Sequence, residues 1–188
     1  MKNFTVKKLL LPISEYATVS LGTTLFDAIL ALEQAQEKFY HGKYQHRAIL
    51  VLDDEKKVVG RISQHRILKA IEAGEELSKD LSKLKMFNFS DAYIENIRET
   101  IRLDTKIFTQ QALKKAAGKK VEEFMQKPTP DEYVAESSPL DIAVHKLVSG
   151  NHLSLLVKRD EEIIGVLRIA DVFVAACHGM KALNIGEK

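Results

Sequence analysis

Apolar residues recur with helical spacing in two separate parts of the chain. They stand at Leu25, Ala28, Ile29 and Leu32, and again at Leu140, Ala143, Val144 and Leu147. Spacing of three and four places such residues on one face of a helix, so each segment is predicted to be a helix with one buried stripe. Thr24 and Ser138 precede these segments and are types that accept hydrogen bonds from free amides at a helix start. Pro139, which the first helical position tolerates, supports the second start.

Each predicted helix is followed by two short runs rich in aliphatic residues. The runs are 48–52 and 58–62 in the first half, around the charged segment 53–57, and 153–157 and 163–167 in the second half, around 158–162. Runs of this length that flank a polar turn predict β-hairpins. A further helix is predicted to begin near Gln64, and another near Ile169. Each half is therefore predicted to run strand, helix, strand, strand, helix.

The two halves are repeats of one unit. At a shift of 115 residues, the segment that begins at Val6 overlays the one that begins at Val121. From residue 48 onward the shift is 105 residues, which places 48–52 on 153–157 and Gly60 on Gly165. The first repeat thus carries about ten extra residues near 39–46. The pattern predicts an α+β fold that contains two βαββα units.

The segment between the repeats, 74–120, is predicted to be helical because it contains no proline and carries apolar residues at helical spacing. These are Leu77, Leu81 and Leu84 in one stretch and Ile94, Ile97, Ile101 and Phe108 in another. Ser90 is a candidate N-cap for the second stretch. We expect the stripes to be core or dimer interface rather than a membrane-surface helix, because acidic residues are mixed with the basic ones.

Composition narrows the possible functions. Lys and Arg number 28 against 26 Asp and Glu, a net charge of +2 that does not favour nucleic-acid binding. The one cysteine, Cys177, cannot form an intramolecular disulfide, and with His178 it is too little for a zinc site. No apolar run approaches the roughly 18 residues of a membrane span. A cytoplasmic protein without a metal site, a membrane segment or a nucleic-acid partner is expected.

Motifs of common enzyme classes are missing from the sequence. It has no phosphate-binding glycine-rich loop, no HExxH, no Gly-x-Ser-x-Gly, and no Cys, His and Asp set that spacing nominates. His145 and His152 are expected to be structural or exposed, since no further metal ligands stand at useful spacing. A catalytic function is therefore not predicted.

Several weak motifs in the same order twice over resemble the cystathionine-β-synthase (CBS) domain family. In the second repeat they are Val-x-x-Phe-Met-x-x-Pro before the first strand, Ser-Ser-Pro-Leu-x-x-Ala at the first helix, and Ile-Ile-Gly-Val-Leu-Arg-Ile-Ala-Asp after the hairpin. The pair of repeats, at roughly 6–73 and 121–180, resembles a Bateman module. This resemblance implies that the two βαββα units pack sheet to sheet as one module, with the helical insert between them in the sequence. The expected organisation is repeat 1 at 1–73, a helical insert at 74–120, repeat 2 at 121–180 and a tail at 181–188.

The resemblance implies a regulatory module with clefts between the units that bind adenosine nucleotides or S-adenosylmethionine. The family motif is Gly, two apolar residues, Ser or Thr, two residues, and an Asp that accepts from ribose hydroxyls. Repeat 1 has Gly60, Ser63 and Arg66, whereas repeat 2 has Gly165, Arg168 and Asp171. Neither motif is complete, and the Asp171 cleft is the better candidate.

Physical chemistry adds further candidate ligand residues. Phosphate is favoured where a strand enters a helix N-terminus, which makes Arg168, His65 and Arg66 anion candidates. Apolar walls for an adenine are predicted at Val134, Leu153 and Leu155. Each polar candidate also has a structural interpretation, because Asp171 suits a first helical turn, Ser63 suits an N-cap and Arg66 suits a solvated surface.

The predicted function is a small-molecule-binding regulatory module that senses AMP, ADP, ATP or S-adenosylmethionine and acts through its own dimer or on a partner protein. The retained Asp171 with its basic neighbours favours binding. The alternative is an assembly module whose clefts have lost their ligand, which the incomplete motifs favour. A homodimer in which the insert takes part is expected in either case.

Overall fold

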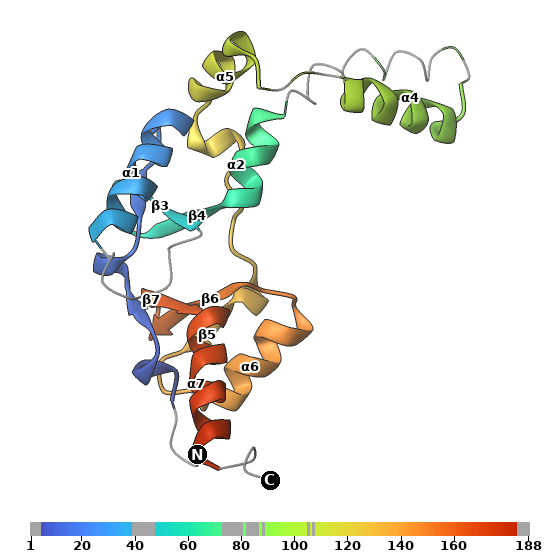
Figure 1. Ribbon diagram of the computed structural model, residues 1–188. Helices are drawn as coiled ribbons and strands as arrows, with labels where there is room; N and C mark the ends of the chain where they lie inside the picture. The colour runs from blue at the N-terminus through green and yellow to red at the C-terminus, as the bar shows by residue number, and fades with distance from the viewer. Residues whose placement is uncertain are drawn as a thin grey trace.

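The computed structural model describes residues 5–38, 48–72, 81, 87, 89–104, 106 and 108–183. They form two βαββα units, each with a small mixed sheet covered on one face by helices, and the two sheets face each other (Figure 1). The predicted α+β class and the doubled unit are confirmed. No helix in these ranges combines the length and the apolar character that crossing a bilayer requires.

The first unit has a three-stranded sheet in the order β2-β3-β4. Its elements are β2 (Thr18–Ser20), α1 (Leu25–Lys38), β3 (Ala48–Leu52), β4 (Val58–Ser63) and α2 (Gln64–Ile71). β2 lies parallel to β3, and β3 and β4 form the predicted antiparallel hairpin. Thr24 starts α1 as predicted, because its hydroxyl oxygen accepts from the Asp27 amide at 3.2 Å.

The second unit has a four-stranded sheet in the order β1-β7-β6-β5. Its elements are β1 (Leu11–Pro12), β5 (Tyr133–Ala135), α6 (Leu140–Ser149), β6 (Ser154–Arg159), β7 (Glu162–Arg168) and α7 (Ile169–Ala182). The hairpin turn is shorter than predicted, since Arg159 pairs with Glu162. Ser138 does not cap α6, which begins one residue later with Pro139 at the N-cap.

Alternation along the strands separates three apolar clusters. Ile49 and Val51 of β3 point toward the helices of the first unit, and Leu155 and Val157 of β6 do the same in the second unit. Leu50 and Leu156 point the other way and meet in a cluster between the sheets. Successive residues of a strand face opposite sides, so each sheet buries one face under its helices and the other against its partner.

The predicted alignment of the two repeats is wrong by one residue at β3 and β6. In the structure Leu50 pairs with Thr18 and Leu156 pairs with Tyr133, so Leu156 is the counterpart of Leu50 and the shift there is 106 rather than the predicted 105. Side chains alternate with a period of two, and a slip of one residue turns each to the other face. Leu155 therefore points into the core beneath α6 and α7, away from the opposite sheet.

The segments that precede the two units are exchanged. β1 pairs with β7 of the second unit, where Leu11 lies opposite Val166. Conversely, Val121 and Phe124 pack into the core of the first unit, and Gln126 bridges to β4. Short 3₁₀ helices lie in these segments at Val6–Lys8, Ile13–Glu15, Val121–Glu123 and Pro130–Glu132. Each unit is thus completed by the segment that precedes the other unit in the sequence.

The insert contains α4 (Asp91–Asp104) and α5 (Gln110–Ala117). Ser90 caps α4 as predicted, accepting from the Tyr93 amide at 3.2 Å. α4 lies away from the sheets (Figure 1) and is tied to the end of α2 by an Arg102–Glu72 ion pair. Ile94 is buried, whereas Ile101 is 37% exposed. The predicted positions Leu77 and Leu84 lie outside the described residues.

Candidate functional site

Arg168 and Asp171 meet at the junction of β7 and α7. Arg168 ends β7 and is the N-cap residue of α7, and Asp171 lies in the first turn of that helix. The guanidinium holds the carboxylate through two bonds, Nε to Oδ2 at 2.6 Å and Nη2 to Oδ1 at 2.7 Å. Arg168 is 8% exposed. The structure therefore brings the two strongest predicted site residues together, as partners of each other.

This pairing fixes the Asp171 carboxylate without using all of its acceptor capacity. A carboxylate has about four lone-pair positions, and the fork of Arg168 takes two of them. The other two suit the adjacent hydroxyls of a ribose. Two parallel bonds from one guanidinium fix the orientation of the carboxylate.

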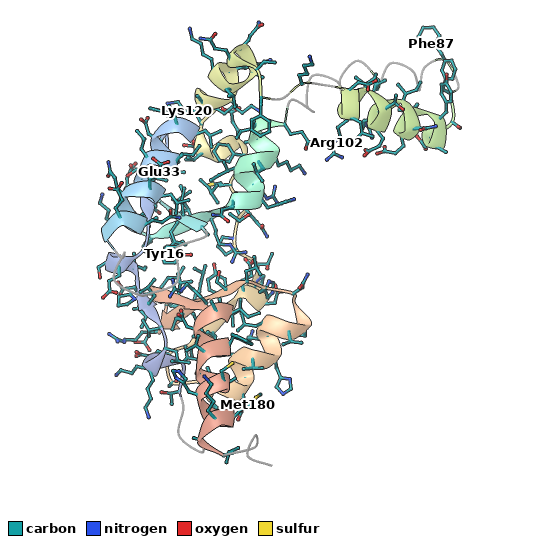
Figure 2. All side chains as sticks on the ribbon, viewed as in Figure 1. Tyr16, Glu33, Phe87, Arg102, Lys120 and Met180 are labelled. Atoms are coloured by element: carbon teal, nitrogen blue, oxygen red, sulfur yellow. The ribbon has the colours of Figure 1, made fainter. Side chains whose placement is uncertain are left out.

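Tyr16 is a third member of this region that the sequence did not single out. Tyr16, which is labelled in Figure 2, is 7% exposed and belongs to the apolar cluster between the sheets. Burial raises the pKa of its hydroxyl to about 12, while Arg168 and Arg61 oppose that rise and Asp171 adds to it. The phenol is therefore neutral over the physiological range and lies within reach of both arginine charges.

The equivalent junction of the first unit holds Ser63, His65 and Arg66. Ser63 is the N-cap of α2, and its hydroxyl accepts from the Arg66 amide at 3.3 Å. His65 is exposed and Arg66 is half-buried. This junction is basic and has an arginine where the other has Asp171, so it suits an anion but offers no carboxylate for a ribose.

The three predicted adenine walls do not gather on one surface. Val134 and Leu155 are buried in the core of the second unit, under its helices. Leu153, just before β6, is 64% exposed. The register of β6 explains this arrangement. Ser154 and Leu156 face the sheet of the first unit, whereas Leu155 faces the helices of its own unit.

A buried ion pair joins the two units. Arg61 of β4 contacts Glu132 at 2.5 Å and also reaches the carbonyl and hydroxyl oxygens of Ser154 at 3.3 and 3.2 Å. Glu132, only 2% exposed, accepts from the Thr129 amide at 3.0 Å as well. Sequence reasoning missed this pair, because its members stand 71 residues apart and form no motif.

His152 packs beside that ion pair. Its Nε2 lies 2.8 Å from Asp131 Oδ2, and its Nδ1 lies 3.8 Å from Glu132 Oε1. Hydrogen bonds from the Thr129 hydroxyl and then from His152 lower the pKa of Asp131. Among the residues that the structure describes, no group of three or more His, Cys, Asp or Glu side chains is arranged to hold a metal ion.

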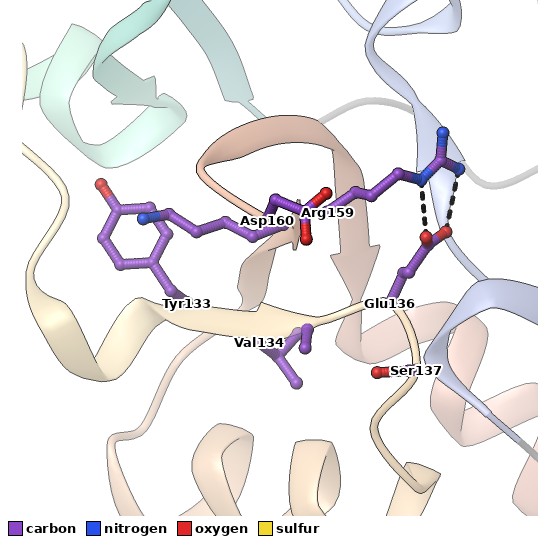
Figure 3. Close-up of a pocket in the computed structure, with 8 residues that line it drawn as sticks. Tyr133, Val134, Glu136, Ser137, Arg159 and Asp160 are labelled. Carbon is purple, nitrogen blue, oxygen red and sulfur yellow. Dashed lines mark hydrogen bonds and ion pairs between the residues drawn. The ribbon is translucent and has the colours of Figure 1, made fainter.

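An open pocket of about 430 Å³ lies at the far end of β5 and β6 (Figure 3). Arg159 donates to both oxygens of Glu136 there, at 2.6 and 2.9 Å, and Lys158 lies 4.4 Å from the Tyr133 ring centre. Arg168 pairs with Ser154 at the start of β6, whereas this pocket is at the end of that strand. The pocket is therefore separate from the Asp171 junction.

Comparisons with known proteins agree on the fold. Residues 6–73 match the CBS domain family. CBSX2 solved in complex with AMP is 22% identical over 94% of this chain and 98% of its own, with a TM-score of 0.57. CBSX2 from Arabidopsis thaliana, described as a CBS-pair protein, is 20% identical over 95% and 98%, with a TM-score of 0.59.

A CBS domain-containing protein of unknown function from Bacillus anthracis is 18% identical, covers 94% of both chains and has a TM-score of 0.61. No protein with a curated description matches the sequence. The solved structures establish the fold across both units, and the family match establishes the domain at 6–73. Residues 6–73 therefore match the CBS domain family, and the chain has the fold of CBS-pair structures over nearly its whole length.

Proposed function

We propose that the chain is a non-catalytic regulatory module that binds an adenosine-containing ligand at the β7–α7 junction. The observation that carries the proposal is the Asp171 carboxylate, held by Arg168 in the first turn of α7. Support comes from the AMP present in the CBSX2 structure that shares this fold. The ligand classes are AMP, ADP, ATP and S-adenosylmethionine.

The chemistry of the junction suits a nucleotide in two respects. Asp171 retains acceptor positions for ribose hydroxyls, and the first amides of the 14-residue helix α7 carry positive partial charge. Arg66, at the start of α2, supplies a cationic group that suits a phosphate at the other junction, and His65 beside it can donate a hydrogen bond. A reducing cytoplasm fits the single cysteine, Cys177, which is unpaired.

Isothermal titration calorimetry with AMP, ADP, ATP and S-adenosylmethionine tests the proposal. We expect one adenosine ligand to bind per chain, and guanine nucleotides to bind more weakly. Asp171→Asn should weaken binding by about ten- to a hundredfold, because a hydrogen bond to a charged group contributes about 1.5–3 kcal/mol. Asp141→Asn is the matched control, since Asp141 occupies the first turn of α6 in the same unit and is exposed.

Two results would contradict this assignment. One is wild-type affinity in Asp171→Asn, and the other is an equal loss in Asp171→Asn and Asp141→Asn. The second result would mean that each aspartate acts only on the stability of its helix. A melting curve of each variant without ligand separates that effect from ligand binding.

The alternative function is an assembly module without a ligand. It is favoured by the fact that both charged clusters are satisfied internally, with Arg168 on both oxygens of Asp171 and Glu132 on Arg61. This alternative predicts no heat of binding and no rise in melting temperature with any of the four ligands at millimolar concentration. A dimer that persists under those conditions would then be the functional state.

A further inference from the structure

One side of α4 is exposed along nearly the whole helix. Tyr93 and Leu103 are 50% and 78% exposed, and Asn96 and Thr100 between them are exposed as well. Spacings of three and four residues place all four on one side of the helix, which we call the α4 stripe. At a rise of 1.5 Å per residue, Tyr93 and Leu103 lie about 15 Å apart. Because α4 lies away from the sheets (Figure 1), neither sheet covers this stripe.

The ion-paired side chains of α4 lie outside the stripe. At about 100° per residue, Glu95, Arg98 and Arg102 fall on a different side of the helix. Arg98 pairs with Glu95, and Arg102 pairs with Glu72 of α2 at 2.5 Å and with Glu99 at 3.4 Å. The stripe itself is uncharged, so the surface that complements it is also uncharged, and burying it breaks none of these ion pairs.

The stripe has the size that association of two chains needs. Phe89, which is 44% exposed, extends it past the start of α4 by stacking on Tyr93, with the ring centres 5.1 Å apart. An aromatic side chain buries 150–250 Å² when fully covered, so the stripe and Phe89 of two copies together bury on the order of 1,000 Å². Specific protein–protein interfaces begin at about this area.

The stripe is complementary to itself when two copies of α4 pack antiparallel. Tyr93 then lies against Leu103 of the second copy and Asn96 against Thr100, because both pairs are centred on residue 98. The Thr100 hydroxyl donates to the Asn96 carbonyl of its own chain at 2.9 Å, and it keeps an acceptor position for the Asn96 side-chain amide of the second copy. One twofold axis therefore satisfies all four positions, as an interface between identical surfaces requires.

The antiparallel direction and the register each have a physical reason. A parallel pair would align the two helix dipoles and would place every acidic residue at the level of its own copy, whereas an antiparallel pair opposes the dipoles. A shift of one helical turn would place Asn96 against Leu103, and a polar residue opposite an apolar one in such a seam disfavours that register.

We propose that the chain forms a homodimer through α4, whose stripe packs antiparallel against the same stripe of a second copy with Asn96 facing Thr100. This interface lies in the insert, outside both repeats, and it does not use the β7–α7 junction. The proposal therefore goes beyond the proposed function, because the dimer forms whether or not a ligand is bound.

Opposite charges placed at Tyr93 and Leu103 test the pairing. Analytical ultracentrifugation measures the dimer dissociation constant of the wild type, Tyr93→Glu, Leu103→Lys and the double variant. Each single substitution should weaken the dimer by about tenfold or more, because a charge at an apolar contact must be desolvated on association. The double variant should dimerise about fivefold or more tightly than either single variant, since antiparallel packing brings the two new charges together across the interface.

The control variant changes charge on another side of α4. Glu95→Gln raises the net charge by one unit, as Leu103→Lys does, and Glu95 is exposed. Its dimer dissociation constant should stay within about twofold of the wild-type value, because a surface ion pair contributes little. Tyr93 and Leu103 are exposed as well, so circular dichroism should show the same folded spectrum for all of these variants.

Disulfide cross-linking reports the register. In a Cys177→Ser background, which removes the one native cysteine, chains with Asn96→Cys are mixed with chains with Thr100→Cys. Antiparallel packing puts these two positions at the same level, whereas two Asn96 positions lie four residues apart along the helix axis, or about 6 Å. Disulfide geometry tolerates little displacement, so mixed disulfides should exceed either self-disulfide by about fivefold or more.

Three results would overturn the proposal. A mass of one chain at every concentration excludes the dimer. A dimer that tolerates both Tyr93→Glu and Leu103→Lys assembles through a different surface. A double variant weaker than either single variant, or self-disulfides in excess of mixed ones, means that the two helices do not pack antiparallel in this register.

Discussion

Gly60 and Gly165 occupy the same position in the two repeats, and each lies beneath a segment exchanged from the other unit. A Cβ at Gly165 would lie 2.5 Å from the Leu11 carbonyl oxygen, which is backbone of a paired strand. A Cβ at Gly60 would meet the Met125 sulfur, at the end of a flexible side chain. The glycines of the family motif therefore serve the packing of the exchanged segments.

Gly165→Ala is expected to destabilise the protein by about 1–3 kcal/mol, because the added methyl group pushes on backbone that is held in the sheet. Gly60→Ala should cost less, since the Met125 side chain can adopt another rotamer. Gly118→Ala is the control, because its nearest neighbour would lie 3.8 Å away and its φ is ordinary for alanine. Chemical denaturation of the three variants measures the order, and equal losses at all three positions would contradict it.

Single residues of the candidate site were only partly predictable. The motif positions placed Arg168 and Asp171 at the strand–helix junction correctly, because the junction is a local feature. Their mutual pairing was not predicted, since it depends on side-chain orientation three residues apart at a helix start. Tyr16 carries no local signal at all, because an aromatic residue near a strand is usually core.

At the scale of elements, the ion pair of Arg61 with Glu132 joins β4 to the second unit. Its ion pair differs from the surface pairs in burial, with side chains 15% and 2% exposed for Arg61 and Glu132 against 56% and 17% for Arg159 and Glu136. Breaking a buried pair leaves a charge without solvation, whereas an exposed partner is rehydrated.

Arg61→Ala should therefore reduce the free energy of unfolding by about 3–5 kcal/mol, and Arg159→Ala by about 1 kcal/mol or less. Urea denaturation of Arg61→Ala and Arg159→Ala measures and compares the two losses of unfolding free energy. Replacing Arg61 and Glu132 together with apolar residues should recover part of the loss, because no charge is then left buried. An Arg61→Ala protein as stable as Arg159→Ala would show that the pair is solvated.

The helices and hairpins were predictable because their signals are local, as at Thr24 and Gln64. The register of β6 was not, because four successive buried residues, Ser154 to Val157, give no alternation to fix it. The Arg61–Glu132 pair could not be predicted for a different reason. Its two residues stand 71 positions apart, and no spacing pattern in the sequence links residues so far from each other. The exchanged segments were equally hidden, because the repeats look self-contained in sequence.

At the scale of the whole molecule, apolar side chains remain exposed on the insert. Leu103 of α4 is 78% exposed and Phe108 is 72% exposed. Exposed apolar groups of this size favour association, and identical chains most often associate as twofold dimers.

Light scattering should accordingly return about twice the chain mass of 21.2 kDa at micromolar concentration. Leu103→Lys is expected to shift the equilibrium toward the monomer, because a charge at an apolar contact must be desolvated on association. Asp104→Asn, at the neighbouring exposed position, is the matched control, because it raises the net charge by the same one unit. A mass near that of one chain over a wide concentration range would refute the dimer.

The exchange of leading segments has a consequence for how the chain is made. Leu11 finds its partner in Val166, and the core of the first unit receives Val121 and Phe124 from beyond the insert. Domains usually fold as they leave the ribosome, from the N-terminus onward. Here the earliest strand stays unpaired until β7 has emerged, and the first unit lacks part of its core until the insert has been synthesised. Contacts this far apart in sequence close slowly, so we expect the first unit to complete its core only after the insert has emerged, and β1 to pair only after β7 has emerged.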